Sequence, residues 1–396
     1  MKTYTGASRR RLRAPLALGV VAVLLSACGT EQEGSSAAGG AAADCANADE
    51  AQAEYEKAWT EAADQLGLDD LEPTEERVCE VDTSELKAEP KSGDSYRIAF
   101  AAQGPTNSWA LTNEEAFKYR ADELGVEVLY AAANGDATVQ VDNIQQLASQ
   151  DPDAMVVVPM GEGITGQVRA ASEQGIPVIL CAGRLGEDSG AVSTVTRQYE
   201  LLGTMYAEWL VQQLGGKGQV AVLSGLAGVP TAEYQKAAAL KVFATYPDIE
   251  VVTEQYTEWS PTVAKTVAAN LVTQYPDLAG IWSDSGYGDL GVVQAYQEAG
   301  KPVPPLTGDA INAFLKAVQG TDVKFALSSF PPEQSMDCLD TAMSVLEGKP
   351  VLDKVYINSP SFTHEQLDEY VRPECTDNLF VPALLPEEEL ARLELC

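Results

Sequence analysis

From residue 97 onward, short apolar runs alternate with longer segments rich in helix-forming residues. Short, nearly continuous apolar runs are typical of buried parallel strands, and the longer amphipathic segments are typical of the helices that cover them. The pattern predicts strands at residues 97–102, 126–130, 154–159 and 177–181, and helices at residues 114–124, 139–149 and 165–174.

The same alternation repeats in the second half of the chain. Strands are predicted at residues 219–224, 250–256 and 280–283, and helices at residues 200–214, 231–246, 263–274 and 290–299. Two such repeats of strand and helix predict an α/β fold with two doubly wound parallel-sheet lobes. Because ligands bind beyond the carboxyl ends of strands in such sheets, we expect one cleft between the lobes.

The N-terminus combines a positive segment with an apolar run at residues 16–25, which is too short to span a bilayer. The run ends in Leu25-Ser26-Ala27-Cys28, which resembles a bacterial lipobox. We therefore expect residues 1–27 to be a lipoprotein signal peptide and Cys28 to carry the lipid. An ordinary secretory peptide cleaved near Ala27 is the alternative, and the pattern leaves Sec and twin-arginine export both open.

The next two segments differ in composition. Residues 28–44 are rich in Gly, Ala and Ser, which predicts a flexible tether. Residues 45–94 predict a helical extension with its helix near residues 51–66. Besides Cys28 there are six cysteines, and an even number outside the cytoplasm favours disulfides. We expect Cys45 to pair with Cys79, and the other pairings stay open.

The charge balance narrows the classes of partner. The formal net charge of −33 argues against binding to nucleic acid. The single histidine, His364, argues against a multi-histidine metal site and a Ser-His-Asp triad. The glycine-rich residues 161–163 and 215–218 lack the spacing of nucleotide-binding loops. We therefore expect no metal and no cofactor.

Several motifs resemble the periplasmic sugar-binding proteins of the ribose/galactose-binding class. They are residues 153–159 followed by 170–179, the stretch 278–284, and Leu306-Thr307-Gly308-Asp309. The resemblance implies a type I periplasmic binding protein, with a three-strand hinge near residues 193–196, 328–330 and Tyr356. It also implies that residues 334–346 form a helix of the first lobe. The implied first lobe is 95–196 plus 331–355, and the second is 197–330 plus 356–396.

The resemblance also carries over candidate ligand contacts, with one tryptophan from each lobe placed to stack on a sugar ring. The aspartate that usually precedes Arg184 and an arginine near Tyr234 are missing. Taken without the resemblance, the tryptophans would be core residues and the aspartates turn or cap residues. The implied contacts are Gln103, Asn107, Trp109, Arg184, Tyr234, Gln235, Trp259, Asp284, Asp309 and Ser329.

The resemblance implies a monomeric substrate-binding lipoprotein on the extracytoplasmic face of the cell membrane. It would capture a sugar or polyol by hinge closure and deliver it to an ABC transporter permease. The alternative is a protein that binds an amine or signalling molecule and feeds a membrane sensor. A glycosidase-like enzyme is disfavoured, because two carboxylates on separate moving lobes would lack the preorganisation that catalysis needs.

Overall fold

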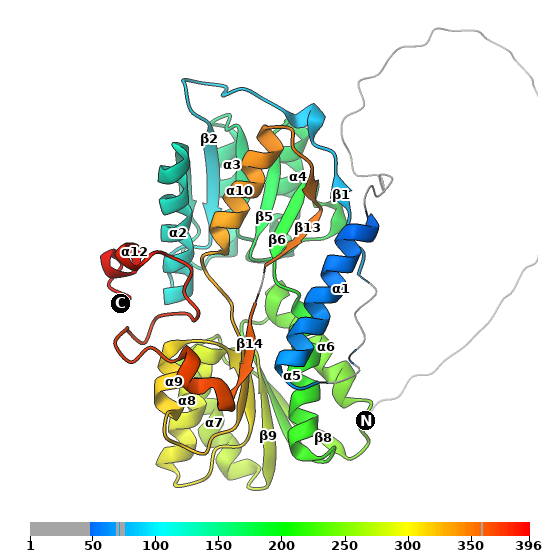
Figure 1. Cartoon of the computed structure of the whole chain (residues 1–396), viewed down its shortest axis with the longest axis vertical. Helices are drawn as coiled ribbons and strands as arrows, with labels where there is room; N and C mark the ends of the chain where they lie inside the picture. Colours follow the sequence, from blue (N-terminus) through cyan, green and yellow to red (C-terminus); the bar gives the residue numbers. More distant parts are fainter. Residues whose placement is uncertain (1–47, 69–70, 72–75, 358) are drawn as a thin grey trace, which may run out of the picture. The chain divides into compact units, whose positions relative to one another are not determined.

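The computed structural model describes residues 48–68, 71, 76–357 and 359–396, which fold around two six-stranded sheets (Figure 1). The first sheet has the strand order β13-β6-β5-β4-β2-β3, and all its pairings are parallel. Its strands are β2 (Arg97–Ala102), β3 (Glu127–Ala132), β4 (Ala154–Val157), β5 (Val178–Cys181), β6 (Ser193–Thr196) and β13 (Lys354–Tyr356).

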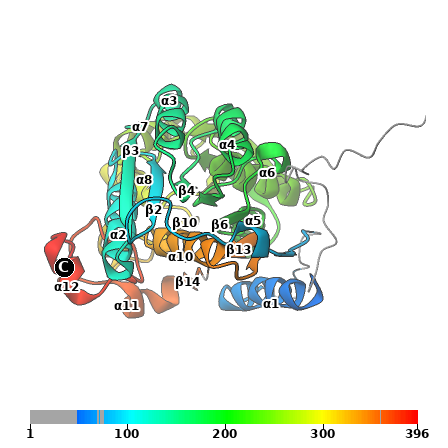
Figure 2. The same cartoon turned by 90° about the horizontal axis from the view of Figure 1, so that it is seen from above.

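Helices cover both faces of this first sheet. Phe117 of α2 (Ser108–Leu124) and Leu339 of α10 (Gln334–Leu346) pack in one core cluster, and Ile144 of α3 (Ala137–Ala148) packs with α4 (Thr165–Glu173) in another. Figure 2 shows α3 and α4 on one side of the strands and α10 on the other. The prediction that residues 334–346 form a first-lobe helix is therefore confirmed.

The second sheet has the order β14-β11-β10-β9-β7-β8, with β14 antiparallel to β11 and the other pairings parallel. Its strands are β7 (Gly218–Ser224), β8 (Ile249–Tyr256), β9 (Leu278–Ser283), β10 (Leu306–Asp309), β11 (Phe325–Ser328) and β14 (Ser361–Thr363). The helices α5 (Tyr199–Leu214) and α6 (Pro230–Phe243) pack on one face, and α7 (Pro261–Gln274), α8 (Gly286–Glu298) and α9 (Asn312–Val318) pack on the other.

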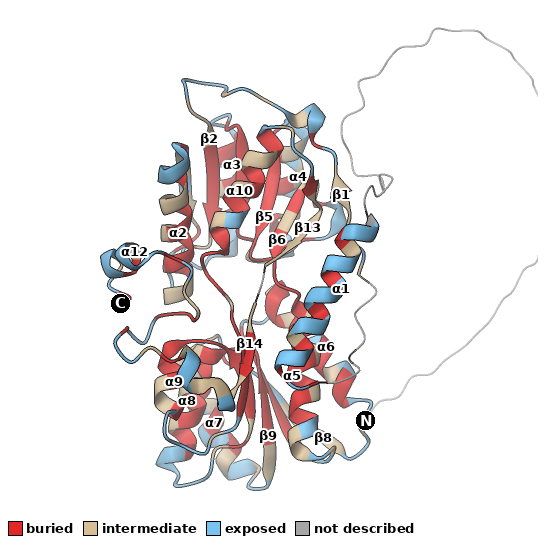
Figure 3. Ribbon diagram, viewed as in Figure 1, coloured by how far each residue is buried: buried red, intermediate tan, exposed pale blue. Residues whose placement is uncertain are grey.

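The chain passes between the two sheets three times: after β6, after β11, and between β13 and β14. The predicted α/β class, with two doubly wound lobes joined by a three-strand hinge, is confirmed. Figure 3 shows that buried residues concentrate on the strands and on the helix faces turned toward them. Trp282 is completely buried, as expected for a tryptophan inside a strand.

Some helices begin earlier than the apolar periodicity predicts. The helix expected from residue 114 begins at Ser108, because the Asn107 side chain caps it by accepting from the Ala110 N–H. The helix expected from residue 290 begins at Gly286, capped by Ser285. Capping fixes a helix start independently of the apolar periodicity, so the first turn can be polar.

The N-terminal extension is folded onto both lobes. Helix α1 (Ala48–Gln65) buries Tyr55 and Trp59 against α5 of the second lobe. The two-residue strand β1 (Glu80–Val81) pairs with β12 (Val351–Leu352), which follows α10 of the first lobe. The expected helix in the extension is confirmed. The short helices α11 (Leu367–Tyr370) and α12 (Glu387–Arg392) lie in the C-terminal segment.

Two disulfides join described cysteines, Cys181 to Cys338 and Cys375 to Cys396. Cys79 is also disulfide-bonded. Its expected partner Cys45 lies outside the described residues, as does Cys28, so the Cys45–Cys79 pairing and the lipidation stay predictions. No helix in the described ranges is long and apolar enough to cross a membrane.

Candidate functional site

A cavity of about 960 Å³, including its open mouth, is lined by residues of both lobes at the carboxyl ends of their strands. This is the position expected for a ligand in doubly wound sheets. Most of the predicted contacts line it, namely Gln103, Asn107, Trp109, Gln235, Trp259, Asp284 and Asp309.

A buried ion pair stands at the centre of the polar lining. Arg197 directly follows β6, and its Nη1 donates to Asp309 Oδ1 at the end of β10, over 2.7 Å. The same nitrogen donates to the Ser329 carbonyl over 3.2 Å. Burial raises the pKa of the Asp309 carboxyl above its ordinary value, and the charge and hydrogen bond of Arg197 offset this rise only in part. Removing two charges from water costs free energy, and only such close pairing offsets that cost. Loss of either residue would therefore leave the other charge buried and unpaired.

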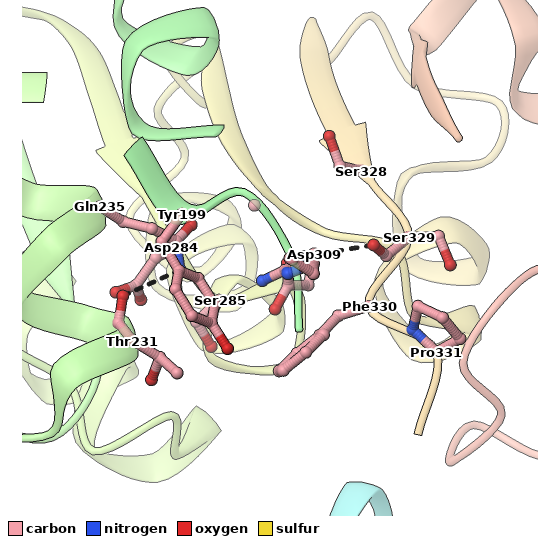
Figure 4. Close-up of polar contacts among 12 residues, drawn as sticks. Tyr199, Thr231, Gln235, Asp284, Ser285, Asp309, Ser328, Ser329, Phe330 and Pro331 are labelled. Carbon is pink, nitrogen blue, oxygen red and sulfur yellow. Dashed lines mark hydrogen bonds and ion pairs between the residues drawn. The ribbon is translucent and has the colours of Figure 1, made fainter. Parts of the chain in front are cut away.

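The guanidinium of Arg197 also lies over an aromatic ring. Its central carbon is 3.8 Å from the ring centroid of Phe330, and the same ring stacks on the Trp109 indole at 4.8 Å. Trp109 Nε1 donates to the Phe330 carbonyl over 3.1 Å. In the view of Figure 4, Phe330 lies on one side of Asp309 and Asp284 lies on the other. The stack fixes the position of Arg197 beside the cavity.

Asp284 follows β9 and is held by neutral donors. Its Oδ2 accepts from the Ser224 hydroxyl at 2.8 Å and the Gly225 N–H at 3.2 Å, and its Oδ1 accepts from Trp259 Nε1 at 3.1 Å. Burial, together with the nearby charge of Asp309, raises the pKa of Asp284 to about 7, although these hydrogen bonds lower it. Trp259 therefore lines the cavity and also has a structural partner in Asp284.

Two fully buried side-chain atoms of the lining residues have no hydrogen-bond partner in the described part of the chain. They are Nε of Arg197 and Oε1 of Gln235, whose side chains are 1% and 2% exposed. The Gln235 amide nitrogen donates to the Thr231 carbonyl, which fixes the side chain and leaves its oxygen open. An unpaired buried donor or acceptor is costly, so both atoms fit a site that is completed by a ligand.

Three predicted contacts lie outside the lining. Arg184 stacks on the ring of Tyr234 at 3.7 Å and forms ion pairs with Glu200 and Glu76. Those two carboxylates, one of them from the extension, hold Arg184 away from the cavity. Ser329 contributes its backbone carbonyl to Arg197 and does not line the cavity. The placement of Arg184, Tyr234 and Ser329 as ligand contacts therefore finds no support in this geometry.

The arginine of the site is Arg197, which is not among the contacts predicted from the sequence. A signal was present, because the residue directly follows a predicted crossing strand and arginine is almost never fully buried unless paired. Asp289 of α8 was also missed. It is 1% exposed, and burial raises its pKa well above the ordinary value. It does not line the cavity but packs against Gly308, where a Cβ would sit 2.2 Å from Asp289 Oδ2.

The two lining carboxylates, Asp284 and Asp309, stand at the ends of neighbouring strands of the same lobe. Both belong to the second lobe, to which the resemblance assigns residues 197–330, so the motion of the lobes does not separate this pair. Asp309 is bound by Arg197, and no group of three or more His, Cys, Asp or Glu residues in the described ranges is arranged to hold a metal ion.

Comparisons with known proteins agree with this architecture. The chain is 27% identical over 283 residues to the xylitol-binding protein of Mycolicibacterium smegmatis, covering 70% of this chain and 80% of that protein. It is 22% identical over 277 residues to the ribose import binding protein of Bacillus subtilis, covering 69% and 90%.

Solved structures share the fold. An ABC transporter solute-binding protein from Mycobacterium smegmatis with bound glycerol superposes with a TM-score of 0.65 at 24% identity, covering 71% of this chain and 98% of that one. The arabinose-binding component from Shewanella gives a TM-score of 0.64 at 23% identity, covering 69% and 93%. Residues 98–350 match the periplasmic binding protein domain, and the chain belongs to that family.

Proposed function

We propose that this protein is an extracytoplasmic substrate-binding protein of an ABC importer, and that it holds a sugar or polyol in the cavity between its lobes. The observation that carries the proposal is a pair of buried atoms without a partner in the described residues, the donor Arg197 Nε and the acceptor Gln235 Oε1, on two side chains that line the same cavity. A hydroxyl group both donates and accepts, so a polyhydroxyl ligand satisfies both kinds of atom.

The relatives support the same class of ligand. Their names state xylitol binding, ribose import and D-apiose import, and a solved neighbour contains L-arabinofuranose. Trp109 and Trp259 line the cavity from different lobes, and indole faces pack on the C–H faces of sugars. We infer a binding role without catalysis, because the carboxylate Asp309 is already engaged by Arg197.

The proposed mechanism is closure about the three crossings. A ligand that contacts both lobes binds the closed state better than the open one, and so shifts the population toward closure. The permease then recognises the closed monomer. We propose that residues 1–27 are removed and that a lipid on Cys28 keeps the protein at the outer face of the membrane, since a tether-like segment follows the lipobox.

Calorimetry with a panel of pentoses, hexoses and polyols tests the ligand class. At least one compound is expected to bind at one site per monomer and to change the tryptophan fluorescence, because closure changes the surroundings of both cavity indoles. The variant Gln235→Leu tests the role of this side chain, because it removes the unpaired acceptor Oε1 and keeps a side chain of similar size. It is expected to weaken binding about tenfold. The absence of binding across the whole panel would contradict the proposal.

A second candidate ligand is an amine or amino-polyol. It is favoured by Asp284, whose hydrogen-bond donors Ser224, Gly225 and Trp259 are all neutral. A buried carboxylate without a cation would gain a charge-assisted hydrogen bond from an ammonium group. Parallel titrations of an amino-polyol and its hydroxyl analogue distinguish the two. Tighter binding of the amine, lost in Asp284→Asn, would favour this second class.

A further inference from the structure

One segment of the cavity lining is apolar, and it is separate from the charged residues of the lining. On the first lobe, Val158, Pro159 and Met160 form a stretch of lining at the end of β4. The polar backbone groups on either side of Pro159 are bonded by one buried side chain, Gln140. Its amide nitrogen donates to the Val158 carbonyl over 2.7 Å, and its oxygen accepts from the Met160 N–H over 3.0 Å. This stretch therefore offers the cavity mainly carbon.

The backbone polar groups of the neighbouring lining residue Ala182 are also hydrogen-bonded within the protein. Its N–H donates to the Val195 carbonyl over 2.8 Å, and its own carbonyl accepts from the Tyr199 hydroxyl over 2.9 Å. We call Val158, Pro159, Met160 and Ala182 the apolar wall. The polar lining residues Gln103, Asn107 and Ser108 of the same lobe come from a different segment, the loop after β2 and the start of α2.

The charged residues of the lining all lie elsewhere. They are Arg197, Asp284 and Asp309, from the first crossing and from the second lobe. The open acceptor Gln235 Oε1 and the open donor Arg197 Nε belong to this same polar side. A ligand hydroxyl placed there gains hydrogen bonds. A hydroxyl pressed against the apolar wall loses its bonds to water without replacement, which is unfavourable.

We propose that the ligand is a polyhydroxyl compound with one deoxygenated position, whose methyl or methylene group packs on the apolar wall while its hydroxyls meet Arg197 and Gln235. This inference rests on the proposed function and narrows its substrate class. The wall selects against a hydroxyl at that position, because the carbonyls of Val158 and Ala182 and the N–H groups of Met160 and Ala182 are already bonded. The side chains of the wall carry no nitrogen or oxygen that could bond a hydroxyl.

Matched pairs of compounds test the inference on the full-length mature protein. Each pair differs by one hydroxyl: D-fucose and D-galactose, D-quinovose and D-glucose, L-rhamnose and L-mannose, and D-fucitol and galactitol. In the pair that fits the cavity, the deoxy compound is expected to bind about tenfold tighter in calorimetry. Equal or tighter binding of the fully hydroxylated partner overturns this inference and leaves the proposed function standing. If these compounds and the wider panel all fail to bind, both are overturned.

Two variants test whether the apolar wall causes the preference. Met160→Gln adds an amide at similar side-chain length, so the affinity ratio within the pair is expected to fall toward one. Leu111→Gln makes an apolar-to-amide change on α2 at a side chain that is 48% exposed and outside the lining, so the ratio should stay as in the parent protein. A ratio that is unchanged in Met160→Gln overturns the assignment of selectivity to this wall, even if the preference itself is present.

Discussion

Arg197 Nη1 lies 2.7 Å from Asp309 Oδ1, and both side chains are largely shielded from water, with 1% and 11% exposed. The two residues are 112 positions apart and come from different parts of the fold, the first crossing and the end of β10. In this pair the positive charge of Arg197 and the negative charge of Asp309 compensate each other on the polar side of the cavity. It also means that Asp309 has a structural partner before any ligand arrives.

Replacement of Asp309 by Ala is therefore expected to lower the free energy of unfolding by about 3–5 kcal/mol, because Arg197 would be left buried and unpaired. The double variant Asp309→Leu with Arg197→Met should recover most of this loss, since neither charge then remains. Urea denaturation of both variants measures the difference.

The control for this pair is Asp377→Ala. Asp377 pairs with Lys316 at the surface, where its side chain is 68% exposed, so its removal should change stability by less than about 1 kcal/mol. If Asp309→Ala proves as mild as this control, the buried pair does not exist in solution as described.

Asp284 predicts a specific dependence of stability on pH. Burial raises its pKa from the ordinary 3.8 to about 7, so the folded state keeps the proton while the unfolded chain loses it near pH 4. Its contribution to stability is fully present below about pH 4, declines as the pH rises, and is lost above about pH 7.

The comparison with Asp284→Asn isolates this contribution from that of other buried acids. Between pH 4 and pH 7.5 the variant should gain about 2–4 kcal/mol in free energy of unfolding relative to the parent protein. Urea denaturation at a series of pH values measures the gain. Parallel stability curves for the two proteins would show that Asp284 titrates normally.

The fold was predictable because its signals are local, whereas the site was predictable only in part. Helix α10 spans residues 334–346 as expected. The buried strands are recognisable in the sequence because they are short and almost entirely apolar. The position directly after a predicted crossing strand favoured Arg197, but the sequence held no local signal that excluded Arg184. Arg184 pairs with Glu76 and Glu200 outside the cavity, whereas Arg197 pairs with Asp309 in the cavity lining. Which arginine lines the cavity therefore depends on ion pairs with residues that are distant in the sequence.

Helix α1 of the extension is expected to be an integral part of the second lobe. Trp59 of α1 is 1% exposed in the core it shares with α5, and its Nε1 donates to the Leu71 carbonyl over 3.2 Å. Trp59→Ala should lower the free energy of unfolding by about 3–5 kcal/mol through the cavity that it leaves. Ligand affinity should change little, because Trp59 does not line the cavity.

Lys57→Ala serves as the control on the same helix, since Lys57 pairs with Glu61 at side chains that are 74% and 60% exposed. Both variants are compared by chemical denaturation and by calorimetry with the best ligand. A Trp59→Ala protein as stable as the Lys57→Ala protein would mean that α1 is not docked on the second lobe.

The two disulfides between described cysteines should differ in what they contribute. Cys181 and Cys338 are 157 residues apart, and Cys375 and Cys396 are 21 apart. In the chain-entropy account, a crosslink stabilises by restricting the unfolded chain, and the effect grows with the length of the closed loop. It amounts to about 5 kcal/mol for the first pair and about 3 kcal/mol for the second.

Paired Cys→Ala variants measure this difference by urea denaturation under non-reducing conditions. Removal of Cys181 and Cys338 should be the more costly, also because both side chains are completely buried between β5 and α10 and leave space behind in the first-lobe core. Removal of Cys375 and Cys396 should mainly loosen the C-terminal segment, whose Arg392 contacts Glu115 of α2 over 2.9 Å. If the short-loop pair proves the more costly, the stabilisation comes from contacts of the C-terminal segment, and loop length is not the cause.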